Sequence, residues 1–195
     1  KDVAPEKIKK DAKLLGYPVL IKASAGGGGR GMRKIEKEED LLSAIETLKG
    51  EAKAGFGDDT LFIEKYIQRP RHVEVQILAD KHGNVLHLGE RDCTIQRRFQ
   101  KLIEESPCPV LSEKKREEIC SAAVKLAKFV GYDSVGTVEF LYDQDEDKFY
   151  FMEMNTRIQV EHPITEQRTG IDLIAQQIRV AQGEKISFAQ KDIKF

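Results

Sequence analysis

The chain has 195 residues, of which 40% are hydrophobic and 33% charged, so its composition is that of a folded domain rather than a disordered segment. Its 32 basic and 33 acidic residues give a net charge of −1, which excludes a protein-wide basic field that would recruit nucleic acid. No apolar run approaches the ~18 residues that a membrane-spanning helix needs, and the three cysteines have neither the pairing nor the spacing of a metal site.

The first third of the chain predicts two helices and three short strands. A helix with Pro5 in its first turn ends before Gly16, and a run of four glycines lies between two of the strands. The expected helices are 5–15 and about 38–54, and the expected strands are 18–23, 32–35 and 60–67.

The remainder of the chain predicts antiparallel hairpins with helices. Strands are expected at 72–80, 85–92, 135–142 and 148–155, and helices at 112–130 and 165–183, whereas 94–107 has no clear pattern. Ser112 is the expected N-cap of its helix, and Gly131 follows the end of that helix. This order indicates an α+β fold with two lobes, a smaller lobe over 1–67 and a larger lobe over 68–195.

The hairpin of VGTVEFLY and KFYFMEMN carries a candidate metal site. If its turn is centred on Glu146, Glu139 lies opposite Glu153 and on the same face, with Asn155 two residues further along. Opposed carboxylates with apolar neighbours repel each other unless one is protonated or a cation lies between them. Their oxygens suit Mg²⁺ or Mn²⁺. The alternative is a register shifted by one residue, in which each glutamate faces solvent.

The glycine run matches GxGxxG at Gly26, Gly28 and Gly31, but its surroundings do not suit a dinucleotide fold. A strand follows the loop where that fold needs a helix, and a Walker A loop would end in Lys-Ser or Lys-Thr. A hairpin loop that closes over a polyphosphate explains the glycines better than a turn without a ligand. Lys22 would then reach an α- or β-phosphate.

The segment after the hairpin combines an anion site with a possible base. Arg157 and Gln159 are suited to hold an anion, and Glu161 could accept a proton beside them. The cations at 22, 97, 98, 101 and 157 could equally form a solvated surface. His72 and His162 could equally have structural roles.

Several motifs, in this order, closely resemble biotin carboxylase, the ATP-grasp component of biotin-dependent carboxylases. They are KASAGGGGRGMR, FIEKYI, RHVEVQILAD, ERDCTIQRR, KLIEESP, GTVEFL and FMEMNTRIQVEHPITE. The resemblance implies a glycine-rich lid at 1–67 and the N-terminal part of the C-terminal subdomain at 68–195. It also implies that the family's N-terminal domain and C-terminal end are absent from this chain.

The family's reaction is carboxylation of biotin with bicarbonate, in which ATP first forms carboxyphosphate. The resemblance implies that ATP is bound by Lys22, Gly26, Gly27, Gly28, Gly29, Glu64, Lys65, Ile67, His72, Gln96 and Leu141. It implies Mg²⁺ or Mn²⁺ at Glu139, Glu153 and Asn155, and bicarbonate at Arg157, Gln159 and Val160. Glu161 would deprotonate bicarbonate, Lys101 would neutralise the transferring phosphoryl group, and Arg157 would stabilise the biotin enolate.

The implied partners are a biotin carboxyl carrier, with biotin as acceptor, and a carboxyltransferase, in a homo-oligomer within the cytosol or the mitochondrial matrix. Phe99 departs from the family, because several bacterial members have a nucleotide-contacting His there, and this puts that contact in doubt. Two alternatives stay open: a Mg·ATP-binding module without turnover, and another ATP-grasp ligase that joins a carboxylate to an amine. We expect this chain by itself to be weakly active or inactive.

Overall fold

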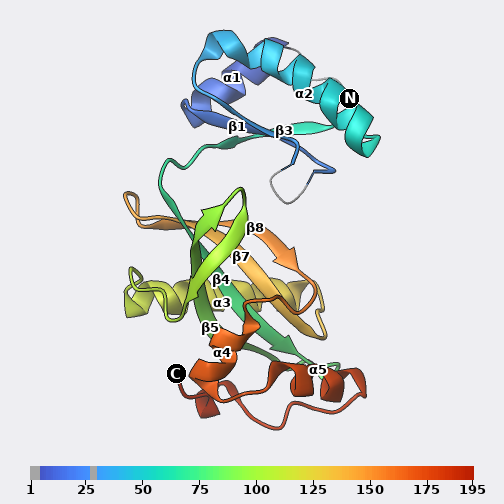
Figure 1. Cartoon of the computed structure of the whole chain (residues 1–195), viewed down its shortest axis with the longest axis vertical. Coiled ribbons are helices and arrows are strands. Elements are labelled where there is room, and N and C mark those ends of the chain that lie inside the picture. Colours follow the sequence, from blue (N-terminus) through green and yellow to red (C-terminus); the bar gives the residue numbers. More distant parts are fainter. Residues whose placement is uncertain (1–4, 27–29) are drawn as a thin grey trace. The chain divides into compact units, whose positions relative to one another are not determined.

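A computed structural model describes residues 5–26 and 30–195, and the chain divides into two compact units (Figure 1). Unit 1 is Lys1–Gln68 and unit 2 is Arg69–Phe195. Each unit combines helices with an antiparallel sheet, so the expected α+β class is confirmed. Among the residues described, no helix has the length and apolar character that crossing a membrane requires.

Unit 1 is a three-stranded sheet covered by two helices. The strand order is β2-β1-β3, and the elements are α1 (Pro5–Leu15), β1 (Val19–Ala23), β2 (Met32–Ile35), α2 (Leu41–Phe56) and β3 (Leu61–Lys65). A short 3₁₀ turn, η1 (Glu38–Asp40), precedes α2. Alternate residues of β1, such as Val19 and Ile21, pack against Leu41 and Leu48 of α2. Lys22 therefore lies on the sheet face that the helices leave uncovered.

Unit 2 is a five-stranded antiparallel sheet with helices on both faces (Figure 1). Its strand order is β6-β5-β4-β7-β8. The strands are β4 (Pro70–Ala79), β5 (Val85–Arg97), β6 (Gln100–Glu105), β7 (Val135–Asp143) and β8 (Lys148–Asn155). The helices are α3 (Glu113–Phe129), α4 (His162–Thr169), α5 (Leu173–Ala181) and the 3₁₀ turn η2 (Gln190–Asp192).

The central strand β4 is buried on both faces, which determines where polar side chains can collect. Val73 and Val75 pack toward α3, in a core that includes Ile119. Leu78, on the opposite face, packs toward Leu173 of α5. His72, Glu74 and Gln76 share the face of Leu78, because side chains alternate along a strand.

The predicted register of the last hairpin is confirmed at the position that matters. Glu139 of β7 lies opposite Glu153 of β8, and Thr137 lies opposite Asn155. A β-bulge follows Glu139, so the pairs nearer the turn are shifted by one residue. Glu139 is buried but Glu153 is exposed, so the expected partial burial holds for one glutamate and not for the other.

Elsewhere in unit 2, one expected helix is wrong, one stretch without a predicted structure is now defined, and one expected helix cap is confirmed. The single helix expected over 165–183 is wrong, because Gly170 ends α4 in a left-handed conformation (φ +69°) and the side chain of Asp172 caps the start of α5. The stretch 94–107, left without assignment, continues β5 and forms β6. Ser112 caps α3 as expected and accepts a hydrogen bond of 3.2 Å from the amide of Lys115.

Candidate functional site

A buried ionic cluster lies on the face of unit 2 that carries His72 and Glu74. Lys101 of β6 is at its centre. Its Nζ lies 2.9 Å from Oε1 of Glu139 and 2.6 Å from Oε1 of Glu161, and it also donates to Oε2 of Glu74. Three carboxylates from three different elements thus surround one ammonium group. The topology brings them together, because β4 pairs with β7 and Glu161 directly precedes α4.

The charges of this cluster stabilise one another. Burial alone would lower the pKa of Lys101, but the negative charge of Glu74 and the contacts with Glu161 and Glu139 raise it above its usual value. Burial would raise the pKa of Glu139, but His72 and Lys101 lower it to about 2. The pKa of Glu161 is also lowered, because its hydrogen bond with Lys101 outweighs burial. Lys101 therefore stays an ammonium group, and Glu139 and Glu161 stay carboxylates, at neutral pH.

His72 extends the cluster toward β5. Its Nε2 lies 2.9 Å from Oε2 of Glu139, and its Nδ1 lies 2.6 Å from Nε2 of Gln96. Gln96 also donates to the carbonyl of Cys93, at 2.7 Å. Because the Gln96 amide donates to Nδ1, the imidazole proton lies on Nε2 and is donated to Glu139. The two residues expected near ribose and phosphates, His72 and Gln96, are thus in direct contact.

Four polar side chains form hydrogen bonds with the carboxylate oxygens of Glu139. Besides Lys101 and His72, Asn155 and Gln159 donate to Oε1 of Glu139 at 2.9 and 3.0 Å. Of the three residues expected to bind metal, Glu139 and Asn155 are therefore in contact. The exposed Glu153 is opposite Glu139 in the sheet but belongs to neither group of possible metal ligands found among the described residues.

The expected anion-binding residues are divided between the cluster and the surface. Gln159 and Glu161 belong to the cluster. Arg157 is exposed, and its guanidinium donates to the carbonyl of Ile158 at 3.2 Å and to Oδ1 of Asn155 at 3.5 Å. The side chain of Val160 is 92% exposed, so only its backbone is suited to hold an anion.

Unit 1 holds the other expected nucleotide contacts. Nζ of Lys22 forms an ion pair of 2.5 Å with Glu64 across the neighbouring strands β1 and β3. The glycine loop connects two antiparallel strands, as expected, since Lys22 pairs with Met32. Gly26 begins this loop, and its amide donates to the carbonyl of Ala23. The positions expected at Gly27, Gly28 and Gly29 lie outside the described residues.

Three further residues expected near the adenine ring are described. Lys65 is exposed at the end of β3, and Ile67 is half-buried just beyond that strand. Leu141, in unit 2, is half-buried and lies opposite His72 in the sheet.

Sequence reasoning missed two central residues, Glu74 and Arg91. Both are fully buried, and they form an ion pair of 2.6 Å. A signal for Glu74 was present: polar residues at 72, 74 and 76 alternate with Val and Ile along a strand. On a central strand, such alternation places polar groups in an interior, where they need partners. Arg91 had no comparable signal, since it follows another charged residue in ERD.

The cluster suits a hard divalent cation. Ligand atoms of His72, Glu74 and Glu139, and those of Glu74, Cys93 and Glu161, lie within 4.8 Å of one another. Burial raises the pKa of the Cys93 thiol, so it stays protonated and the carboxylate oxygens remain as the ligands. Three carboxylates face two cations, Arg91 and Lys101, and this excess negative charge favours Mg²⁺ or Mn²⁺.

A family model, "Carbamoyl-phosphate synthase L chain, ATP binding domain", matches residues 3–189. The chain belongs to this family. Within it, the chain is 58% identical to biotin carboxylase 1 of Bacillus subtilis over 94% of its own length, and 54% identical to the biotin carboxylase of Haemophilus influenzae over 96%. It spans only 41% and 42% of those two proteins.

Solved structures agree with the family assignment. A biotin carboxylase from Campylobacter jejuni matches 99% of this chain with a TM-score of 0.92 and 54% identity, and the chain covers 43% of that protein. The biotin carboxylase domain of 2-oxoglutarate carboxylase from Hydrogenobacter thermophilus, solved with MgADP, ADP and bicarbonate, matches 98% with a TM-score of 0.91 and 54% identity, and the chain covers 42% of it. These matches confirm the resemblance to biotin carboxylase and the expected ATP-grasp fold.

Proposed function

We propose that the protein containing this chain carboxylates biotin with bicarbonate and ATP, and that this chain supplies ATP-, metal- and bicarbonate-binding residues. The buried cluster around Lys101 carries the proposal, because it joins an ammonium group, a possible base and a cation site in one interior. The Hydrogenobacter domain solved with MgADP and bicarbonate, 54% identical, supports the choice of substrates.

In the proposed reaction, bicarbonate attacks the terminal phosphorus of ATP, which releases ADP and forms carboxyphosphate. Carboxyphosphate, or the CO₂ that it releases, then carboxylates N1 of biotin, and the phosphate left behind takes up the N1 proton. Positioning and charge neutralisation provide most of the catalysis in such a transfer.

The nucleotide contacts are assigned to each unit separately, from the resemblance to biotin carboxylase. Lys22 and the loop Gly26–Gly29 would hold phosphates, and Glu64, Lys65, Ile67 and Leu141 would line the adenine site. His72 and Gln96 would contact the ribose and phosphates. Glu139, Glu153 and Asn155 would hold Mg²⁺ or Mn²⁺, which would offset the negative charge of the phosphates.

Bicarbonate would be held by Arg157, the amide of Gln159 and the backbone of Val160, with Glu161 as its base. Lys101 controls how readily Glu161 accepts a proton. The ammonium group lies 2.6 Å from Glu161 and holds it as a carboxylate. If Lys101 turns toward the transferring phosphoryl group, Glu161 loses that contact and its affinity for a proton rises. Arg157 would later stabilise the biotin enolate.

The proposed partners are a biotin carboxyl carrier and a carboxyltransferase, and the proposed assembly is a homo-oligomer. We propose the cytosol or an organelle as the compartment, and relatives named as mitochondrial in Arabidopsis and as chloroplastic in Populus support the organelle. The expected choice between cytosol and mitochondrial matrix is thereby widened to include the chloroplast.

One experiment separates this function from its alternatives. ADP release by the longest natural protein that carries this chain is measured with Mg·ATP, with and without bicarbonate and free biotin. We expect ADP release to require bicarbonate and to increase when free biotin is added. A Mg·ATP-binding module would bind Mg·ADP in calorimetry without turnover, and a carboxylate–amine ligase would release ADP only with an amine. Either result refutes biotin carboxylation.

A further inference from the structure

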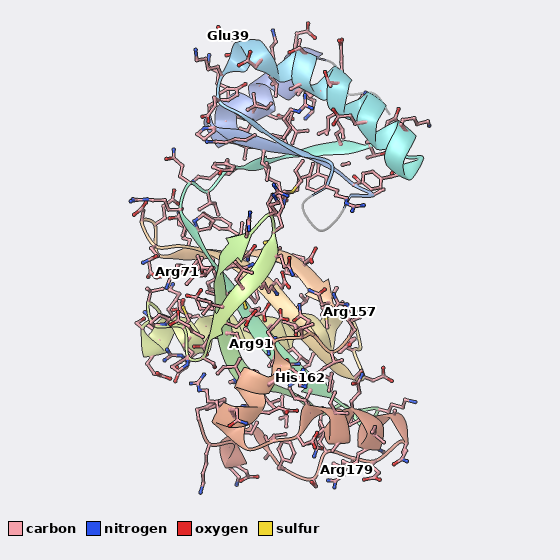
Figure 2. The ribbon with its side chains drawn as sticks, in the orientation of Figure 1. Glu39, Arg71, Arg91, Arg157, His162 and Arg179 are labelled. Atoms are coloured by element: carbon pink, nitrogen blue, oxygen red, sulfur yellow. The ribbon has the colours of Figure 1, made fainter. Side chains whose placement is uncertain are left out.

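Arg91 of β5, labelled in Figure 2, lies in the interior of unit 2 with no exposed surface. Its Nε donates to Glu74 at 2.6 Å, and its Nη1 donates to Gln76 at 2.7 Å and to Thr165 at 2.9 Å. Its Nη2 donates to Thr137 and to Gln159, both at 3.3 Å. These contacts use all five N–H groups of the guanidinium.

The partners of Arg91 belong to four parts of unit 2. Glu74 and Gln76 are on β4, Thr137 is on β7, Gln159 is in the segment before α4, and Thr165 is on α4. Only Glu74 is charged. An arginine needed only to neutralise Glu74 would not require four neutral acceptors. Arg91 therefore orients the side chains around it as well as balancing the charge of Glu74.

The contact with Gln159 determines which way its amide points. Oε1 of Gln159 accepts from Arg91, and Nε2 donates to Glu139 at 3.0 Å. A flipped amide would place N–H against N–H at Arg91 and oxygen against carboxylate at Glu139. Only the observed orientation makes both hydrogen bonds. The contacts described for Gln159 use one of its two Nε2 hydrogens, which leaves an N–H group suited to an anion.

We propose that Arg91 is a positioning residue that fixes Gln159 with its remaining N–H group toward bicarbonate and holds Glu74 against Lys101. This role rests on the proposed function, because it assumes that Gln159 binds bicarbonate. Arg91 does not touch the reacting atoms in this account. It acts through Gln159 and Glu74.

The test substitutes Arg91→Lys in the longest natural protein that carries this chain. Lysine keeps the charge but is a point donor that cannot reach Glu74 and Gln159 in the same forked geometry. We expect the KM for bicarbonate to rise at least tenfold, with the KM for Mg·ATP within twofold of its original value. An unchanged KM for bicarbonate would overturn the proposal.

A control variant and a double-mutant cycle distinguish a positioning role of Arg91 from a general loss of stability. Thr165→Val removes another Arg91 acceptor without touching Gln159, so it should lower the melting temperature while the KM for bicarbonate changes less than twofold. In a Gln159→Ala background, Arg91→Lys should raise that KM no further, because the part of its effect that concerns bicarbonate binding passes through Gln159 and the contact with Glu74 does not. A tenfold rise with Thr165→Val, or additive losses in the double variant, would show that Arg91 has only a structural role.

If Arg91→Lys does not fold, Gln159→Glu provides a second test. It keeps an oxygen for Arg91 but removes the N–H donors, so the KM for bicarbonate should again rise at least tenfold. A rise below twofold overturns the proposal. If the unsubstituted protein already lacks bicarbonate-dependent turnover, the proposed function fails, and this role fails with it. Normal turnover with an insensitive Arg91→Lys variant overturns the role of Arg91 alone.

Discussion

Removing the ammonium group of Lys101 should destabilise the fold in a way that depends on pH. Lys101→Met leaves Glu74, Glu139 and Glu161 without the cation that all three contact. Breaking a buried ion pair by removing one partner typically costs ~3–5 kcal/mol, because an uncompensated charge stays in the interior. We therefore expect the free energy of unfolding at pH 7 to fall by about 3 kcal/mol or more.

The sign of the pH dependence follows from Glu139. Its folded pKa of about 2 lies below the ordinary value of 4.5, so its contribution to stability is present above pH 4.5 and is lost as pH falls toward 2. The shift corresponds to roughly 3 kcal/mol at about 1.4 kcal/mol per pKa unit. In Lys101→Met, the uncompensated carboxylates repel one another and therefore bind protons more readily. Their protonation at lower pH removes this repulsion and restores part of the lost stability. The difference between the two proteins should therefore shrink by more than half between pH 7 and pH 4.

The assay is urea denaturation with EDTA present, so that metal does not replace the ammonium group. Lys7→Met is the matched control, because Lys7 forms an exposed ion pair with Asp11 and its loss should cost less than ~0.5 kcal/mol. If Lys101→Met lowers the free energy of unfolding at pH 7 no more than this control does, Lys101 does not stabilise the buried carboxylates. A cost that is the same at pH 7 and pH 4 would refute the electrostatic explanation.

Three other predictions concern separate parts of the chain. Glu153→Gln should weaken Mn²⁺-dependent nucleotide binding at least tenfold, or about 1.4 kcal/mol, in calorimetry with the longer protein; an unchanged affinity would remove Glu153 from the metal site. Asp80→Ala should cost about 3 kcal/mol in urea denaturation, because Asp80 accepts hydrogen bonds from His82, Asn84 and Ile186; a loss under ~0.5 kcal/mol would contradict this. Ser112→Ala should cost about 1 kcal/mol by the same method as the N-cap of α3 is lost, whereas no change would mean that the cap is replaced.

The hairpin of β7 and β8 could be predicted because local signals agreed there. β7 is rich in Val, Thr and aromatic residues and β8 in aromatic residues and Met, and one polar turn separates them, so a hairpin is predicted; counting from a turn centred on Glu146 places Glu139 opposite Glu153, as observed. The pairs nearer the turn are shifted by one residue from that count, and the β-bulge after Glu139 compensates for this shift, so the predicted pair is correct. A strand buried on one face tolerates little freedom of register.

Other features depended on contacts that no local pattern encodes. The turn between β5 and β6 uses Arg98 and Phe99 with positive φ angles of 53° and 65°, where Gly or Asn is the usual signal. The hairpin at 94–107 was therefore missed. Arg91 becomes central only because α4 and the segment before it bring Gln159 and Thr165, distant in sequence, to the interior where Arg91 lies.

We propose that this fold serves ATP-dependent carboxylation of biotin in the protein that carries it. The most direct test of this proposal follows labelled bicarbonate into acid-labile carboxybiotin by the longest natural protein that carries this chain, with ADP counted in the same samples. We expect label in biotin in proportion to ADP, and loss of both with Glu161→Gln. ADP release without labelled biotin, or full labelling by the Glu161→Gln variant, would contradict it.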